Sequence, residues 1–175
     1  INLRERLAQE LRTLLKQTGT TTLLVTHDQQ EAFAMGDRIG VLDQGRMQQW
    51  ADARTLYDAP ATPFVARFIG HGMLLPIQAD ANGQLQPALG VLPGQHAADS
   101  RQLLLRSHDL QYDPLSPIHA RLLGSSYQGS HQIYTLELAD GSTVQATMPA
   151  VLQHTPGEMI GVRLQQDRGL LVFGE

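Results

Sequence analysis

The sequence contains no cysteine, few aromatic residues and no long apolar run. Without cysteine there are no disulfides or thiolate metal ligands, which is compatible with a reducing compartment. No stretch approaches the roughly 18 consecutive apolar residues of a membrane span. Aromatic residues make up 5% of the 175 residues, and the net charge is -4 with no concentrated basic face. This composition argues against nucleic-acid binding.

The N-terminal part of the chain has the pattern of an α/β segment. Asn2 can cap a helix that is ended by Gly19 in a left-handed conformation. A run rich in Thr and Val predicts a buried strand over 22–26, and a helix is predicted over 28–36. Apolar residues recur at helical spacing in the first helix and are expected in the core: Leu3, Leu7, Leu11, Leu14 and Leu15.

A hairpin and two short helices complete this segment. Strands are predicted over 38–42 and 46–50, around Asp43-Gln44-Gly45, where the glycine suits a positive φ. Helices are predicted over 52–58 and 63–69, separated by prolines.

From residue 71 onward, Gly and Pro punctuate short apolar runs, which is typical of a small all-β domain. The clearest signal is a hairpin with a turn at Asp140-Gly141. Strands are predicted over 74–79, 84–89, 102–107, 118–125, 131–138, 142–148, 159–164 and 170–173.

His27 is the first candidate functional residue, because it follows the predicted strand 22–26 directly. Ligands of open α/β sheets bind outside the carboxyl ends of the strands. A lone histidine at such a position is more often structural, so His27 gains weight only from its neighbours.

Those neighbours form an ordered series of motifs that resembles the switch-histidine region of ABC-transporter ATPases. The series is Thr26-His27-Asp28-Gln29-Gln30-Glu31-Ala32, Asp37-Arg38-Ile39-Gly40-Val41-Leu42-Asp43-Gln44-Gly45-Arg46, Leu56-Tyr57-Asp58-Ala59-Pro60 and Phe64-Val65-Ala66-Arg67-Phe68-Ile69-Gly70. Residues 71–175 resemble the TOBE region, an OB-like barrel that follows many importer ATPases. The carrying segments are Leu104-Leu105-Arg106-Ser107-His108-Asp109-Leu110, the hairpin Tyr134 to Ala146 and Pro156-Gly157-Glu158.

The resemblance implies a fold in two parts. Residues 1–70 would be the C-terminal α/β remnant of a P-loop ATPase domain, and residues 71–175 an all-β, OB-like TOBE domain with a regulatory and dimer-contact role. His27 would contact the γ-phosphate of ATP and help to orient the attacking water in the intact dimer. The intact protein would use ATP and Mg at the cytoplasmic face of the membrane. Its implied partners are a second ATPase subunit, membrane permease subunits and, indirectly, a solute-binding protein.

The sequence lacks the motifs that would bind ATP. No G-x-x-x-x-G-K-[ST] loop, no LSGGQ-type signature and no apolar strand ending in Asp-Glu occurs in it. The chain therefore looks like the C-terminal part of a transport ATPase, beginning just behind the catalytic acid. Alone, it is expected to be inactive and to bind no cofactor.

The missing half poses a packing problem for residues 1–26, since their apolar surface would have no sheet to cover. We expect residues 1–20 to be rearranged, poorly ordered or paired with another copy of the chain. The strand at 22–26 would lack its neighbours.

Three functions remain open from the sequence. The first is a fragment of an ABC importer ATPase, with ferric iron favoured over other ions, polyamines or sugars because of the segment Met73 to Pro76. The second is an autonomous ligand-sensing or protein-interaction module, and the third is a nucleic-acid-binding barrel, which the charge disfavours.

No metal site is predicted, because the histidines lack the spacing of ligand pairs. Those other than His27 are expected at the surface or in loops: His71, His96, His108, His119, His131 and His154. Asp28 and Glu31 lie in the first turn of the helix 28–36 and are expected to cap it. Asp37 and Arg38 are expected to have structural roles at the entrance of the next strand.

Overall fold

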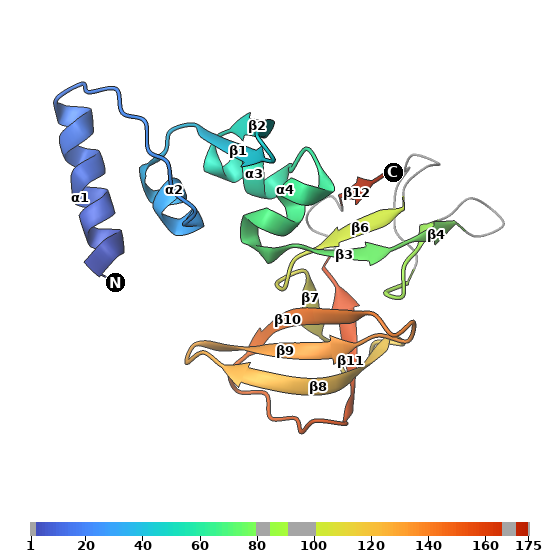
Figure 1. Cartoon of the computed structure of the whole chain (residues 1–175). Helices are drawn as coiled ribbons and strands as arrows, with labels where there is room; N and C mark the ends of the chain where they lie inside the picture. Colours follow the sequence, from blue (N-terminus) through green and yellow to red (C-terminus); the bar gives the residue numbers. More distant parts are fainter. Residues whose placement is uncertain (1–2, 80–84, 91–100, 166–170, 175) are drawn as a thin grey trace. The chain divides into compact units, whose positions relative to one another are not determined.

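The computed structural model describes residues 3–79, 85–90, 101–165 and 171–174. The chain divides into two compact units, Ile1–Ile69 and Gly70–Glu175 (Figure 1). Among the helices that the structure describes, none combines the length and apolarity needed to cross a bilayer.

The first unit begins with helix α1 (Leu3–Gln17), and its end confirms the sequence prediction. Gly19 has a φ of 63°, and the amide of Thr20 donates to the carbonyl of Leu15 at 3.0 Å. This is the left-handed helix end that glycine favours. The predicted cap, Asn2, lies outside the described residues.

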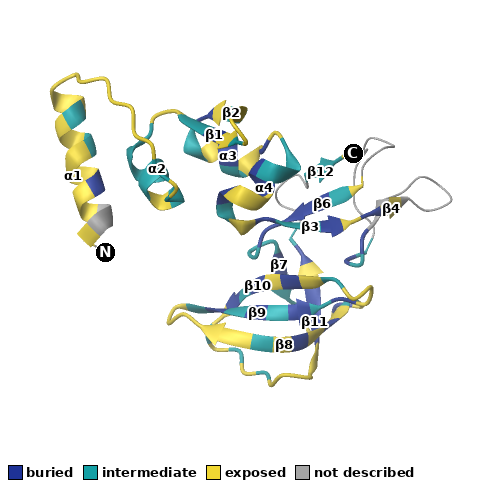
Figure 2. Ribbon diagram, viewed as in Figure 1, coloured by how far each residue is buried: buried dark blue, intermediate teal, exposed yellow. Residues whose placement is uncertain are grey.

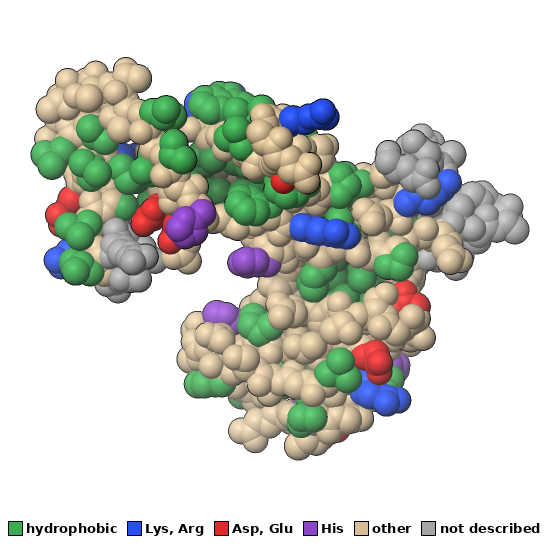
Figure 3. Space-filling view, viewed as in Figure 1, with side chains coloured by type: hydrophobic (Ala, Val, Ile, Leu, Met, Phe, Trp, Pro, Cys, Tyr) green, Lys and Arg blue, Asp and Glu red, His purple; other side chains and the backbone are tan. Residues whose placement is uncertain are grey.

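The prediction that the leucines of α1 lie in a core is wrong. Leu3, Leu7, Leu11 and Leu14 are each 47–59% exposed, and Leu15 is half-buried. Exposed residues run along most of α1 in Figure 2, and green hydrophobic side chains are visible over the same helix in Figure 3. The helix forms because its residues favour it, but the described part of the unit offers no apolar surface broad enough to cover this face. Leu3–Gln17 is helical in the structure. Poor order of residues 1–20 and pairing with another copy both stay predictions.

The predicted strand at 22–26 is also absent. Residues 20–26 are extended, without a strand partner among the described residues, and Leu23 and Val25 are 85% and 88% exposed. A strand is defined by the ladder that pairs it, so a β-prone sequence without a neighbour stays an extended segment. The pattern identified a sheet-forming sequence, and no sheet among the described residues includes it.

The remaining elements of the first unit follow their predictions closely. They are α2 (Gln29–Met35), β1 (Ile39–Asp43), β2 (Arg46–Ala51), α3 (Ala53–Asp58) and α4 (Pro63–Phe68). Strands β1 and β2 form an antiparallel hairpin through Gln44 and Gly45, with φ values of 47° and 75°. Two successive positive φ values define the tight turn that matches strand twist, and glycine takes one of them as expected.

A small core holds the hairpin and the two following helices together. Its buried side chains are Val41, Ala51, Leu56, Val65 and Ile69. Asp52 caps α3 by accepting from the Thr55 amide, and Thr62 caps α4 by accepting from the Val65 amide. A 3₁₀ turn, Ile69–His71, follows α4.

The second unit is built from short antiparallel strands. Three of them, β3 (Met73–Pro76), β6 (Gln102–Leu105) and β12 (Val172–Phe173), form a sheet in the order β12-β6-β3. Strands β4 (Gln78–Ala79) and β5 (Leu85–Gln86) pair with each other. Parts of the predicted strands 84–89 and 170–173 fall outside the described residues.

The larger sheet has five strands in the order β10-β9-β8-β11-β7. They are β7 (Leu110–Tyr112), β8 (His119–Tyr127), β9 (His131–Glu137), β10 (Thr143–Pro149) and β11 (Met159–Leu164). The two ends of the sheet approach each other, since the Thr147 amide donates to the Ser107 carbonyl at 2.6 Å, just before β7. The sheet is therefore nearly closed, which confirms the predicted OB-like barrel after an α/β segment.

Alternation fills the interior of this barrel. On β9, Gln132, Tyr134 and Leu136 are buried, and the residues between them are partly exposed. Tyr134 pairs with Ala146 and Leu136 with Val144, so the buried faces of β9 and β10 coincide. Gly141 has a φ of 81° in the predicted Asp-Gly turn.

Strand β7 is the element that the sequence did not predict. It has three residues, Leu110–Tyr112, and Pro114 follows closely. So short a run carries no alternation signal. It becomes a strand because β11 pairs with it, Leu164 facing Leu110 and Val162 facing Tyr112.

Candidate functional site

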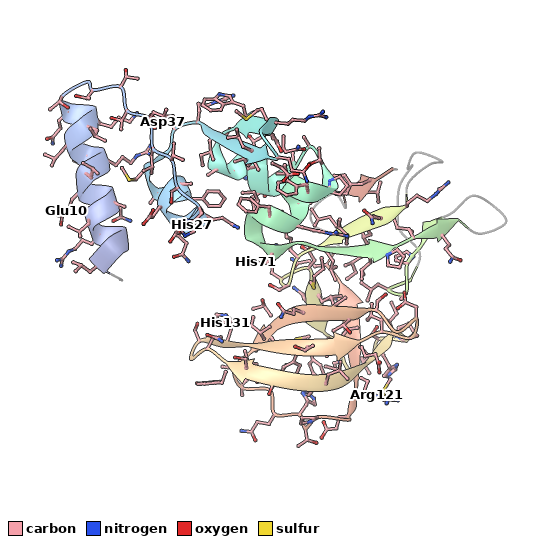
Figure 4. All side chains as sticks on the ribbon, in the orientation of Figure 1. Glu10, His27, Asp37, His71, Arg121 and His131 are labelled. Carbon is pink, nitrogen blue, oxygen red and sulfur yellow. The ribbon has the colours of Figure 1, made fainter. Side chains whose placement is uncertain are left out.

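His27 lies between the extended segment 20–26 and the first turn of α2 (Figure 4). Its side chain is exposed, and no hydrogen bond or ion pair joins it to another residue that the structure describes. Both ring nitrogens are therefore open to an outside group. A neutral imidazole can donate from one nitrogen and accept at the other.

The residue after His27 caps helix α2. The side-chain oxygen Oδ1 of Asp28 accepts from the amides of Gln30 at 2.8 Å and Glu31 at 3.2 Å. Asp28 has the extended backbone of an N-cap, with φ -90° and ψ 113°. The predicted capping role of Asp28 is confirmed.

The residue before His27 is also tied to α2, by contacts that the sequence did not reveal. The hydroxyl of Thr26 accepts from the Asp28 amide at 3.0 Å and donates to Oε2 of Glu31 at 2.8 Å. Glu31 lies in the first turn of α2, as predicted, but its carboxylate accepts from a side-chain hydroxyl, whereas a capping acid would accept from a backbone amide. A threonine five residues before a glutamate is the only signal in the sequence, and it is a weak one.

Helix α2 is held in place from both sides. The side-chain amide of Gln29 donates to the carbonyl of Phe68, at the end of α4. Arg12 of α1 donates to the carbonyl of Met35 at 2.8 Å and to that of Ala34 at 3.4 Å. The last carbonyls of a helix lack partners within it, so an arginine is a suitable donor there.

Asp37 joins α1 to the entrance of β1. Its carboxylate pairs with Arg12 at 2.6 Å and with Lys16 at 2.5 Å. The Lys16 hydrogen bond and the two positive charges hold the pKa of Asp37 below its ordinary value of 3.8. Arg38 donates to the carbonyl of Trp50 at 3.2 Å, across the hairpin. Both residues make structural contacts, as expected.

A groove of about 770 Å³ runs beside this region. Its walls are the C-terminal half of α1, residues 19–26, the end of α2 and one face of the hairpin, with Leu15, Met35 and Trp50 among the lining residues. His27 does not line it. The groove follows the extended segment that lacks strand partners.

The other histidines are scattered, and no three His, Cys, Asp or Glu residues gather as a metal-binding group among the described residues. His108 lies 3.4 Å from Asp109, His131 lies 3.1 Å from the Ser130 hydroxyl, and His119 faces the carbonyl of Pro117. His71 has a φ of 51°. His96 lies outside the described residues.

His154 lies in the loop before β11, as expected of the scattered histidines, and it also packs against two tyrosines. Its Nδ1 lies 3.2 Å from the hydroxyl of Tyr134, and its ring also packs against Tyr112 with a centroid separation of 5.2 Å. Tyr134 is 1% exposed, and burial raises its pKa above 10.0. His154 is half-buried and helps to hold the loop before β11 onto β9.

The described residues do not amount to a nucleotide site. One imidazole is available to a phosphate, but no glycine-rich loop stands beside it, and no group of three metal-binding side chains occurs in the part of the chain that the structure describes. The geometry supports one contact to an anion or a water supplied from elsewhere.

Comparison with known proteins places the second unit in a class. Residues 103–172 match the TOBE domain, so the nearly closed barrel of β7 to β11 and strand β6 belong to a TOBE domain.

The relatives extend the similarity over most of the chain. The chain is 35% identical over 154 residues to the sulfate/thiosulfate import ATP-binding protein CysA of Xanthomonas campestris, covering 84% of this chain and 43% of the relative. It is 30% identical over 174 residues to the spermidine/putrescine import ATP-binding protein PotA of Pseudomonas fluorescens, covering 92% and 47%. It is 36% identical over 149 residues to the Fe(3+) ions import ATP-binding protein FbpC of Rhizobium etli, covering 80% and 42%.

The chain spans less than half the length of these relatives. It belongs to the family of ABC-importer ATP-binding subunits, and its second unit carries a TOBE domain. The resemblance found from the motifs between Thr26 and Gly70 is thereby confirmed.

Proposed function

We propose that this chain is part of the ATP-hydrolysing subunit of an ABC importer and that His27 is its catalytic histidine. The observation that carries the proposal is the exposed, unbonded imidazole of His27, held between an extended segment and an N-capped helix. The relatives are named as import ATP-binding proteins, which supports coupling of ATP hydrolysis to uptake.

His27 would act on the γ-phosphate side of the nucleotide. An imidazole can donate from one nitrogen to a phosphate oxygen and accept at the other from the attacking water or a backbone amide. ATP and its Mg would be held by residues outside this chain. The 175-residue chain alone is therefore expected not to turn over ATP.

The partners and the cargo are part of the same proposal. The intact subunit would work as a dimer against membrane permease subunits on the cytoplasmic side, and a solute-binding protein would deliver the cargo. The relatives are named for sulfate or thiosulfate, polyamines and ferric iron. Ferric iron is the first cargo to test, beside the other two.

The test is the substitution His27→Ala in an ATP-binding subunit that is as long as the relatives and contains this chain. We expect ATP turnover to fall by about a hundredfold or more, in the range of general acid–base contributions, while ATP binding stays within a few-fold of the parent. His119→Ala, in the barrel, is the matched control and should keep parental turnover. Equal ATP turnover by His27→Ala and the parent would refute the catalytic role of His27.

A further inference from the structure

Thr26 and Glu31 form a hydrogen-bonded clamp around His27, and the clamp begins with a helix cap. Asp28 is the N-cap of α2, and Glu31 stands three positions later. In an ordinary capping box, the acid at that position reaches back to the amide of the N-cap residue. Here the Asp28 amide donates to the hydroxyl of Thr26 at 3.0 Å, so that place is taken.

The carboxylate of Glu31 bonds to Thr26 in place of the Asp28 amide. It accepts from the same Thr26 hydroxyl at 2.8 Å. A threonine hydroxyl has one proton to donate and two lone pairs to accept, so both bonds form together. The Thr26 hydroxyl therefore lies between the Asp28 amide and the Glu31 carboxylate, which would bond directly to each other in an ordinary capping box.

The consequence concerns the residue between the two partners. Thr26 is tied to α2 through Glu31, and Asp28 is tied to it as the N-cap, while the side chain of His27 has no partner among the described residues. Thr26 and Glu31 are half-buried, so water competes less for their bond than it would at an open surface. The backbone of His27 is fixed on both sides, and its imidazole is left projecting.

We propose that Thr26 and Glu31 are positioning residues that act through the backbone of His27 to hold its imidazole in place for phosphoryl transfer. This inference rests on the proposed function of His27. Pre-organisation of this kind matters because misplacing a reacting group by about 1 Å can cost a hundredfold in rate. Glu31 itself does not touch the reacting atoms.

The first measurement uses the full 175-residue chain and NMR. In Thr26→Val, which removes the acceptor of the Asp28 amide, we expect that amide to exchange roughly fivefold faster, the loss of one net hydrogen bond of about 1 kcal/mol. In Glu31→Ala that acceptor stays, and the loss of the bond between Thr26 and Glu31 is measured at the His27 amide in both variants. The order parameter of the His27 amide should fall from about 0.85 toward 0.6. Thr26→Ser and Glu31→Gln keep the hydroxyl and an acceptor oxygen, and they should keep the parental values.

Two controls separate the clamp from the stability of α2. Gln30→Ala changes an exposed side chain in the same turn and should alter neither value. The amide of Gly36, which donates to the carbonyl of Ala32 at 2.8 Å, reports whether the helix stays formed. If Glu31→Ala melts α2, Thr26→Val still removes the clamp without touching the helix.

The second measurement carries the same variants into an ATP-binding subunit of full relative length. Thr26→Val and Glu31→Ala should lower kcat by roughly tenfold to a hundredfold with the KM for ATP unchanged, and Thr26→Ser and Glu31→Gln should restore kcat. Unchanged exchange and order in both disruptive variants would overturn the proposal. The proposal would also be overturned if Thr26→Val and Glu31→Ala left kcat unchanged in a subunit whose kcat is lowered by His27→Ala. If His27→Ala itself leaves kcat unchanged, the proposed function fails, and the NMR values alone decide whether the clamp exists.

Discussion

Gly161, in strand β11, is the position where the barrel should tolerate a side chain least. A Cβ built there would lie 2.1 Å from the carbonyl oxygen of Asp113 and 3.2 Å from its carbonyl carbon. Ordinary contacts begin near 3.4 Å, so the backbone at Asp113 would have to retreat by more than an ångström. Both atoms belong to the backbone, and neither can turn away as a flexible side chain would.

Gly161→Ala should therefore destabilise the second unit severely. The retreat would break the bond from the Asp113 amide to the Gly161 carbonyl at 2.9 Å and strain that from the Ser116 hydroxyl to the Val162 carbonyl at 2.6 Å. Overpacking costs about 1–3 kcal/mol and a lost hydrogen bond about 1 kcal/mol, so we expect a loss of about 2–4 kcal/mol. For a unit of this size, that lowers Tm by about 10–20 °C.

Urea unfolding can resolve this effect within one chain. Three of the four tyrosines, Tyr112, Tyr127 and Tyr134, lie in the second unit, and the single tryptophan, Trp50, lies in the first. In Gly161→Ala, the unfolding transition followed by tyrosine circular dichroism should have its midpoint at a lower urea concentration. The transition followed by Trp50 fluorescence reports the first unit and should keep its midpoint.

Gly124→Ala is the matched control. It lies in the same sheet, on β8, and a Cβ there meets nothing within 4 Å. Its stability should stay within about 1 kcal/mol of the parent. If Gly161→Ala unfolds at the same urea concentration as Gly124→Ala, the inference that Gly161 packs too closely against the Asp113 backbone to accept a side chain is wrong.

Two further predictions follow from the polar contacts. Tyr134→Phe removes the hydroxyl that meets His154 and should destabilise the second unit by about 1 kcal/mol in urea unfolding, while Tyr127→Phe, at an exposed tyrosine, should have no effect; equal midpoints for the two would contradict the buried bond. The lowered pKa of Asp37 implies that its stabilisation of the first unit is complete above pH 3.8 and is lost as the pH falls below that value. Acid unfolding monitored at Trp50 should begin at higher pH in Lys16→Met, which removes the main cause of the shift, and an unchanged profile would show that the ion pair does not hold α1.

Local chemistry made much of the fold predictable. The hairpin turn at Gly45, the helix end at Gly19 and the Asp-Gly turn at Gly141 each need a positive φ. Because glycine adopts a positive φ without steric cost, its presence in the sequence predicts these turns. The cap at Asp28 depends on its own helix, so the sequence predicts it as well. The motif series around His27 was enough to identify the family, because its order along the chain is specific.

Other features depended on residues far apart in the chain. Strand β7 exists because β11 pairs with it, and residues 22–26 form no strand because no segment that the structure describes pairs with them. The leucines of α1 have the periodicity of a buried face, but burial needs a covering surface, and the described part of the unit supplies too little of it to bury four of the five. Periodicity records what a segment can bury, whereas the presence of a partner decides whether it is buried.

The sequence by itself determined the family, the change from an α/β segment to an all-β domain near residue 70, and the identity of His27 as the candidate residue. Only the tertiary structure decided that Thr26 and Glu31 meet across His27, that Tyr134 and His154 join within the barrel, and that Gly161 faces the carbonyl of Asp113. Backbone conformation is set by each residue and its neighbours, so the sequence reveals it. Contacts between side chains depend on distances that only the folded chain fixes.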